Sequence, residues 1–289
     1  MTEEQPRGGP TVRRMLLGAQ LRRLRTEAGV SREDAGETIR ASAWKIHRLE
    51  NGQVSYKERD IAELVTRYGV SDPVEVATFI TMAREANMPG WWNPYSDLLP
   101  QWFRAYVDLE AVAAQIRTYQ GQLVPGLLQT EAYMRALMRG TLRDRQPEEI
   151  ERRVMLRLNR QRLLTQDGGP QLWAVMDEAA LRRPVGGRKV LRAQLERLIE
   201  ATTLPRVSLQ VLPFSAGAHA AMVGAFSILR FADQELPDVV YLEHVTNALY
   251  LDKPEDVEEY AHIMSSVGVH GAPPEQTAEI LSELLHDLG

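Results

Sequence analysis

The chain contains no cysteine, which excludes disulfide bonds, thiolate catalysis and every cysteine-based zinc site. Long apolar runs are missing too, because no stretch approaches the roughly 18 consecutive apolar residues that span a bilayer. The first residues, MTEEQPRGGP, lack the apolar segment of a secretory signal. These absences predict a cytoplasmic protein without membrane contact, in which any metal would depend on histidine and carboxylate ligands.

Internal repeats and low-complexity tracts are also absent from the sequence. Its hydrophobic fraction of 44% and charged fraction of 25% are those of a folded globular protein, so extended disorder is not expected. At roughly 100–200 residues per domain, a chain of 289 residues predicts two folded units.

A net excess of positive charge is missing from the chain as a whole and is found only in its first part. The net charge is −5, but residues 1–70 carry +3 and the remaining residues carry −8. Nucleic-acid phosphates attract a local basic surface, whereas the acidic remainder is not expected to lie on DNA.

Helical periodicity and capping residues predict five short helices within a first domain at residues 13–87. Ser31 and Ser42 are suited to cap the second and third helices, and Asp72 with Pro73 starts the fifth. The predicted helices cover residues 15–27, 31–38, 42–51, 57–67 and 72–86.

A junction rich in tryptophan and proline follows at residues 88–103. Its Trp91, Trp92 and Trp102 either anchor this segment onto the second domain or stack on a ligand.

The second domain, residues 104–289, is predicted to be α+β with a mixed sheet of about five strands. Three helices, at 104–118, 130–139 and 147–165, are expected before any strand. The strand segments are LWAVMDE, VSLQVLP, FSILRF, VVYLEH and ALYLD, with a helix at 188–203 between the first two. Two helices, at 254–267 and 274–287, are expected to end the chain.

The stretch SREDAGETIRASAWKIHRLENG has the two helices and intervening turn of a helix-turn-helix motif. Ile39, Ile46 and Leu49 have core-facing spacing. Other positions lie away from that face or at the helix start and are expected to be free to meet DNA: Ser42, Ala43, Trp44, Lys45, His47 and Arg48.

This stretch resembles the DNA-binding domain of xenobiotic-response-element regulators, which are related to phage repressors and Cro proteins. RLENG is a specific part of a likeness that covers residues 13–70 and implies an all-α, five-helix, lambda-repressor-like fold. The resemblance assigns base reading to Ser42, Ala43, Trp44 and Arg48. It assigns phosphate contacts to Arg32, Asn51 and Lys57, and a structural ion pair to Arg25 and Glu50.

Two positions depart from that family pattern. Arg40 stands where the turn glycine is usual, and Gly36 stands where alanine is usual. A left-handed backbone at Arg40 would cost about 1–2 kcal/mol, although an exposed arginine there could reach a phosphate. Trp44 is an unusual base reader, and it could stack on a thymine methyl or a sugar, or be partly buried.

Residues 88–285 resemble the C-terminal domain of an actinobacterial group of antitoxin-like regulators. The matching segments are PGWW, QLVPGLLQTEAY, LWAVMDEAALRRPVGG and SLQVLPFSAGAHAAM. The resemblance implies a partner: a small protein encoded nearby that behaves like a toxin or an anti-repressor. It carries over no catalytic residue.

The second domain is not expected to be an enzyme or to hold a cofactor or metal. The adjacent pairs Asp177-Glu178 and Glu243-His244 cannot act as units on a regular strand, because neighbouring side chains point to opposite faces. A ligand pocket lined by Asp177, Arg182, His219 and Glu243 remains an alternative.

The function expected from these patterns is a transcriptional repressor that binds a palindromic operator in double-stranded DNA as a homodimer. Its second domain is expected to receive the signal from the small partner protein. The alternative is a regulator that senses a small-molecule effector.

Overall fold

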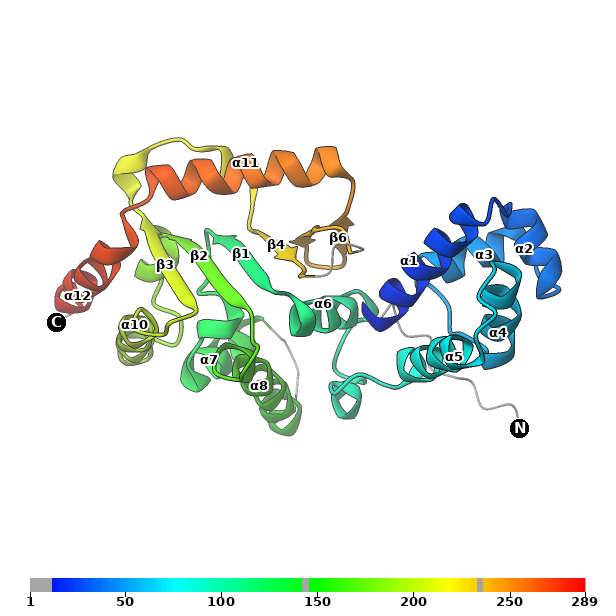
Figure 1. Cartoon of the computed structure of the whole chain (residues 1–289). Coiled ribbons are helices and arrows are strands. Elements are labelled where there is room, and N and C mark those ends of the chain that lie inside the picture. Colours follow the sequence, from blue (N-terminus) through cyan, green and yellow to red (C-terminus); the bar gives the residue numbers. More distant parts are fainter. Residues whose placement is uncertain (1–11, 142–145, 233–235, 289) are drawn as a thin grey trace. The chain divides into compact units, whose positions relative to one another are not determined.

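The computed structural model describes residues 12–141, 146–232 and 236–288. Two compact units are present (Figure 1). The first comprises the described residues up to Leu109 together with Leu236, and the second comprises the other described residues from Glu110 onward. Among the described helices, none combines the length and the apolar character that a bilayer crossing requires.

The first unit contains the five predicted helices, which are therefore confirmed. They are α1 (Val12–Glu27), α2 (Arg32–Thr38), α3 (Ala43–Glu50), α4 (Glu58–Arg67) and α5 (Pro73–Asn87). A short helix η1 (Asn93–Tyr95) and α6 (Gln101–Val112) follow.

Local capping explains where three of these helices begin. The Ser31 hydroxyl accepts a hydrogen bond from the Asp34 amide at 3.0 Å, and Ser42 accepts one from the Lys45 amide at 3.3 Å. The Asp72 carboxylate accepts one from the Val74 amide at 2.9 Å. Each side chain pairs one of the amides that a helix start leaves without an intrahelical acceptor.

The first unit is held together by an apolar core to which all five helices contribute. Its cluster of buried side chains includes Leu17, Leu21, Ala35, Ile46, Leu49, Ile61, Leu64 and Ala83. Tyr56 is 3% exposed, and its hydroxyl donates to the carbonyls of Arg14 and Leu49 at 2.6 and 2.9 Å. Together these two contacts tie the end of α3 to the start of α1.

The second unit is α+β, as predicted, and has a mixed sheet. Its strands are β1 (Gln115–Gln120), β2 (Gln171–Asp177), β3 (Val207–Leu212), β4 (Phe226–Arg230), β5 (Val239–Glu243) and β6 (Ala248–Leu251). The sheet order is β3-β2-β1-β4-β5-β6. The first three strands run parallel, and the other three join antiparallel.

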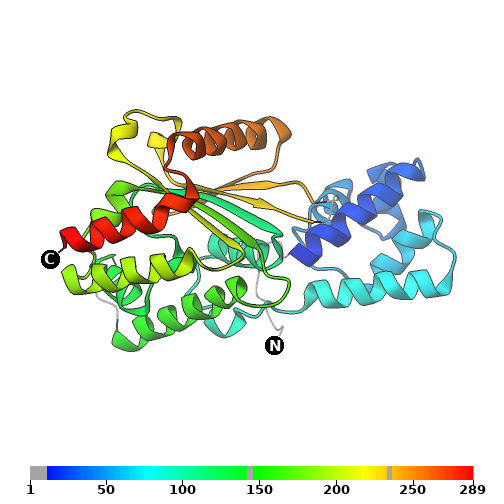
Figure 2. The same cartoon turned by 60° about the vertical axis from the view of Figure 1, so that its left-hand side comes forward.

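Helices cover both faces of this sheet (Figures 1 and 2). The helices of the second unit are α7 (Glu131–Thr141), α8 (Pro147–Gln161), α9 (Glu178–Arg182), α10 (Arg188–Ala201), α11 (Pro254–His270) and α12 (Thr277–Asp287). The short helices are η2 (Gly126–Leu128), η3 (Arg162–Leu164), η4 (Phe214–Ala216), η5 (Ala220–Val223) and η6 (Pro274–Gln276). Figure 2 shows α11 on one face of the sheet and α7, α8 and α10 on the other.

One prediction was wrong, because a helix had been expected through residue 118 with no strand before Gln171. Instead α6 ends at Val112, and β1 occupies Gln115–Gln120, giving six strands rather than about five. The residues of β1 pair with β2 and β4, which lie far along the chain. Strand formation here depends on those distant partners, which local periodicity cannot reveal.

Candidate nucleic-acid interface

The turn between α2 and α3 gives the first unit the geometry of a helix-turn-helix motif. Ile39, Ile46 and Leu49 are 3%, 1% and 2% exposed, so the predicted core-facing positions are confirmed. The opposite side of α3 is left for contacts outside the domain.

Arg40 adopts the left-handed conformation that its turn position requires, with φ of 56°. It is the one non-glycine residue with positive φ in the described part of the chain. The Ala41 amide donates back to the Gly36 carbonyl at 2.8 Å, and the Arg40 amide donates to Glu37 at 3.1 Å, which closes α2. The Arg40 side chain is 71% exposed and lies 3.2 Å from a Glu63 carboxylate oxygen.

Gly36 allows this turn to pack closely against α2. A Cβ atom at Gly36 would lie 2.6 Å from the Ala41 carbonyl oxygen and 3.2 Å from the Ser42 carbonyl carbon. The two departures from the family pattern therefore fall on one turn: Gly36 makes room for it, and Arg40 adopts the strained conformation.

Trp44 and Arg48 both project from the exposed side of α3. Trp44 is 64% exposed, so partial burial is not its role, and its ring stacks on His47 at a centroid distance of 5.2 Å. His47 is in turn contacted by the Asn51 amide at 3.1 Å. Arg48 is exposed and forms no ion pair with a described residue.

Lys45 is not free in the way the sequence pattern predicted. Its ammonium lies 2.8 Å from the Asp60 carboxylate, which is 3% exposed and also 3.3 Å from Arg59. A buried carboxylate needs a cationic partner, so this ion pair gives Lys45 a structural role in the domain. The expectation that Lys45 has no partner within the domain is therefore wrong, although its side chain remains 36% exposed.

The predicted pair of Arg25 and Glu50 is present in the structure and has a third member. Arg25 Nε lies 2.5 Å from one Glu50 oxygen, and Arg32 Nε lies 3.0 Å from the other. The Glu50 side chain is 2% exposed, whereas the Arg32 side chain is 37% exposed. Arg32 is thus held by Glu50 with part of its guanidinium on the surface.

The other predicted DNA contacts occupy the two ends of α3 and the start of α4. Ser42 is exposed and caps α3, and Ala43 is half-buried beside it. Asn51 follows the last turn of α3, and the exposed Lys57 precedes α4 without a capping bond from its side chain.

Of the junction tryptophans, Trp92 is 6% exposed and Trp91 is 41% exposed. The Trp92 indole donates to the Asp108 carboxylate at 2.6 Å, and the Arg104 guanidinium lies 5.7 Å from its ring. Burial raises the pKa of Asp108 to about 6, against the lowering effects of the Trp92 bond and of Arg14. Trp92 therefore anchors the junction onto α6.

In the second unit the structure brings together Asp177 and His219, with a third residue that sequence reasoning missed. His219 Nε2 lies 3.7 Å from an Asp177 oxygen, and the Tyr119 hydroxyl lies 3.4 Å from Asp177 and 3.5 Å from His219. Burial, and then Asp177, raise the pKa of Tyr119. Tyr119 lies in β1, the strand that the sequence did not predict.

In the described ranges, no hydrogen bond or ion pair joins Arg182 or Glu243 to that group. Arg182 pairs with Glu178 at 2.6 Å and approaches Asp287 at 3.7 Å. Glu243 lies at the edge of a cavity of about 260 Å³ between β4, β5 and α11.

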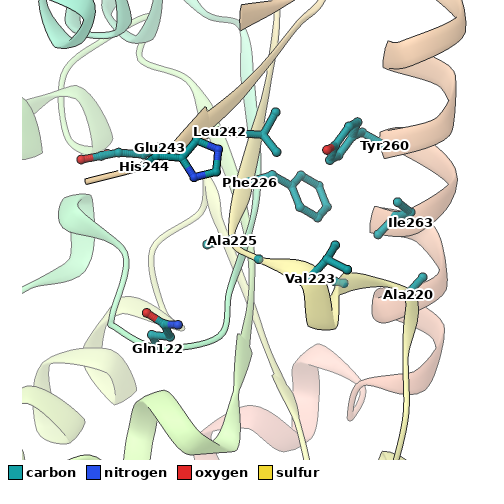
Figure 3. A pocket seen from close by; sticks show the side chains of 12 residues that line it. Gln122, Ala220, Val223, Ala225, Phe226, Leu242, Glu243, His244, Tyr260 and Ile263 are labelled. Atoms are coloured by element: carbon teal, nitrogen blue, oxygen red, sulfur yellow. The ribbon is translucent and has the colours of Figure 1, made fainter. Parts of the chain in front are cut away.

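Figure 3 shows how that cavity is built. Tyr260 and Ile263 of α11 face Phe226 and Leu242 across an apolar interior, and the Glu243 side chain points away from them. The polar lining residues are Gln122, Glu243 and His244.

Two family models match the chain. The model described as Helix-turn-helix domain matches residues 16–79, and the model described as Domain of unknown function (DUF5753) matches residues 103–283. No curated protein and no solved structure matches the chain. The first match supports a DNA-binding regulator, and the second covers more than half of the chain. The chain therefore belongs to the DUF5753 family, with a helix-turn-helix domain preceding the domain that defines it.

Proposed function

We propose that this protein is a sequence-specific transcriptional repressor that binds a palindromic operator as a homodimer, with α3 in the major groove. The proposal rests on the difference in exposure between the two sides of α3. Its inner face is buried, while Trp44 and Arg48 project outward together.

Within this proposal, residues 13–87 bind DNA, residues 88–103 form the junction, and residues 104–289 receive the signal. Arg48 and Trp44 read bases, since they are the exposed long side chains of α3. Ser42, at the start of α3, also lies among the base-reading positions. Contacts to phosphates come from cations and polar groups around α3 that are exposed or half-buried: Arg32, Arg40, Asn51 and Lys57. Ala43 approaches the base edges, and Lys45, whose side chain is 36% exposed, approaches the DNA with the ammonium donors that its bond to Asp60 leaves over.

The second unit is proposed to transmit control from a small partner protein encoded nearby, in the manner of an antitoxin-like regulator. Helix-turn-helix domains are typically non-enzymatic, and no catalytic role is proposed for the group of Asp177, His219 and Tyr119. Control by a small molecule is the second candidate, because the cavity between β4, β5 and α11 offers an apolar interior with polar edges.

The test is operator binding by the full chain, with DNA from its own promoter region, at two salt concentrations. Phosphate contacts predict weaker binding at the higher salt concentration, and base contacts predict a preference over unrelated DNA. Adding the neighbouring small protein should release the DNA if that protein is the signal. Absence of any preference over unrelated DNA would overturn the proposal.

A further inference from the structure

Three arginines of α8 lie on one face of the helix, because Arg153, Arg157 and Arg160 are spaced by four and three residues. Two of them have carboxylate partners of their own. The Arg160 guanidinium donates two hydrogen bonds of 2.7 Å to the Glu110 carboxylate, and the Arg153 guanidinium lies 2.9 Å from the Glu149 carboxylate. The middle arginine, Arg157, forms no ion pair with a described residue.

A neutral amide is the hydrogen-bond partner of Arg157. Its Nη1 donates to the Gln129 Oε1 atom at 3.1 Å. The Gln129 side chain is fixed, since the residue is 4% exposed and its Nε2 donates to the Val124 carbonyl at 2.7 Å. A guanidinium carries five N–H donors, so Gln129 satisfies only a part of this group.

The charge of Arg157 is poorly compensated by its surroundings. Burial, and then the like charge of Arg160, lower the pKa of Arg157 to about 10, while the carboxylate of Glu243 acts in the opposite direction. Glu243 lies beyond ion-pair distance, and its carboxylate accepts a bond from the Tyr241 hydroxyl at 3.2 Å. A largely desolvated cation without an anion is unfavourable, so an apolar side chain would suit a purely structural role better.

The remaining donors of Arg157 are nevertheless not sealed inside the protein. In the described ranges, His219 Nδ1 is the only side-chain nitrogen or oxygen that is both fully buried and without a hydrogen-bond partner. The Nε and Nη2 atoms of Arg157 form no hydrogen bond with a described residue, so they are not fully buried and touch solvent. Arg157 itself is half-buried. A small anion can therefore reach its guanidinium from solvent.

We propose that Arg157 binds the carboxylate or phosphate group of a small anionic ligand beside α8 and η2, with Gln129 orienting the guanidinium. A guanidinium accepts either group through two parallel hydrogen bonds. Gln161 supports the site, since its amide donates to the Gly126 and Gln129 carbonyls at 3.1 and 2.7 Å and holds η2 against α8. Binding itself does not require DNA, but a regulatory effect of the ligand rests on the proposed function.

The test uses the full chain, with inorganic phosphate and acetate as separate probes at constant ionic strength. Thermal unfolding and calorimetric titration measure binding, because a ligand of the native state raises the unfolding midpoint as its concentration rises. At least one probe should raise the midpoint of the wild type, and the stronger probe identifies the chemistry. Failure of both probes would overturn the site.

Arg157→Met and Arg153→Met form a matched pair of variants on one helix. Arg157→Met should weaken the probe at least tenfold and raise the midpoint without probe, whereas Arg153→Met should leave probe affinity within about twofold of the wild type. Equal loss in both variants, or a lower midpoint without probe for Arg157→Met, would contradict the proposal.

Glu243→Gln is an independent variant at an exposed position. Removing this negative charge should strengthen anion binding severalfold, and unchanged or weaker binding would count against the site. Operator binding is then measured with and without the probe. If the anion binds but operator affinity does not change, the anion site is present and is not the site through which a small molecule controls DNA binding.

Discussion

At the scale of single residues, Arg48 and Lys57 should have different effects on DNA binding. Arg48→Ala should cost about 1–3 kcal/mol at one base pair and relax the preference there, because Arg48 projects from the exposed side of α3. Lys57→Ala should weaken all sequences about equally and lower the salt slope by about one, as expected for a phosphate contact. Binding to single-base operator variants measures both. Equal effects on all sequences from both variants would contradict the assignment.

Trp44 offers a second test at this scale, because its indole is 64% exposed and held by the stack on His47. If Trp44 packs on a thymine methyl, replacing one thymine of each half-site by uracil should cost about 0.8 kcal/mol per half-site, the value of one buried methylene. Trp44→Ala should be insensitive to that replacement. Trp91→Ala, at another exposed tryptophan, is the control and should remain sensitive.

At the scale of elements, the turn between α2 and α3 stores strain at Arg40. Arg40→Gly should raise the free energy of unfolding by about 0.5–1 kcal/mol, since the relief of left-handed strain exceeds the entropy that glycine adds to the unfolded chain. The lost pair with Glu63 is exposed and adds little. Gly36→Ala should lower stability by about 1–3 kcal/mol, because its Cβ would lie 2.6 Å from the Ala41 carbonyl oxygen. Urea unfolding compares the two, and a destabilised Arg40→Gly protein would contradict this account.

The contact of α6 with the junction should depend on pH. The pKa of Asp108 is raised to about 6 in the folded protein from an ordinary value of 3.8. The folded state therefore binds this proton more tightly, so the contribution of Asp108 to stability falls as pH rises from about 4 to 6, by at most about 3 kcal/mol.

Asp108→Asn should remove that pH dependence while keeping an acceptor for the Trp92 indole. Relative to the wild type, the variant should gain stability between pH 4 and pH 7. Denaturant unfolding across this range measures the difference, and a constant difference would show that Asp108 does not titrate there.

At the scale of the whole molecule, the proposed homodimer sets the spacing of its operator. Two half-sites on one side of the DNA lie about 34 Å apart, so inserting about 5 bp between them turns one half-site away. Affinity should fall at least tenfold on that insertion, as measured by titration of the full chain with operator variants. Unchanged affinity would show that each half-site is bound independently.

The sequence predicted the features that depend on neighbouring residues. Ser31, Ser42 and Asp72 begin helices where expected, because a cap needs only the next two or three amides. The five strands after residue 170 were recognised from β-branched and aromatic runs between turns. The buried face of α3 followed from helical spacing alone.

Only the tertiary structure decided the features that depend on distant partners. The strand β1 exists because β2 and β4 pair with it, and with it came Tyr119 beside Asp177 and His219. The ammonium of Lys45 is paired with the carboxylate of Asp60, which lies on another helix, α4. Arg157 faces the neutral Gln129 whereas Arg160 faces the carboxylate of Glu110, and both partners are distant in sequence. Composition and periodicity describe one segment at a time, whereas pairing, burial and counter-charge are properties of segments brought together by the fold.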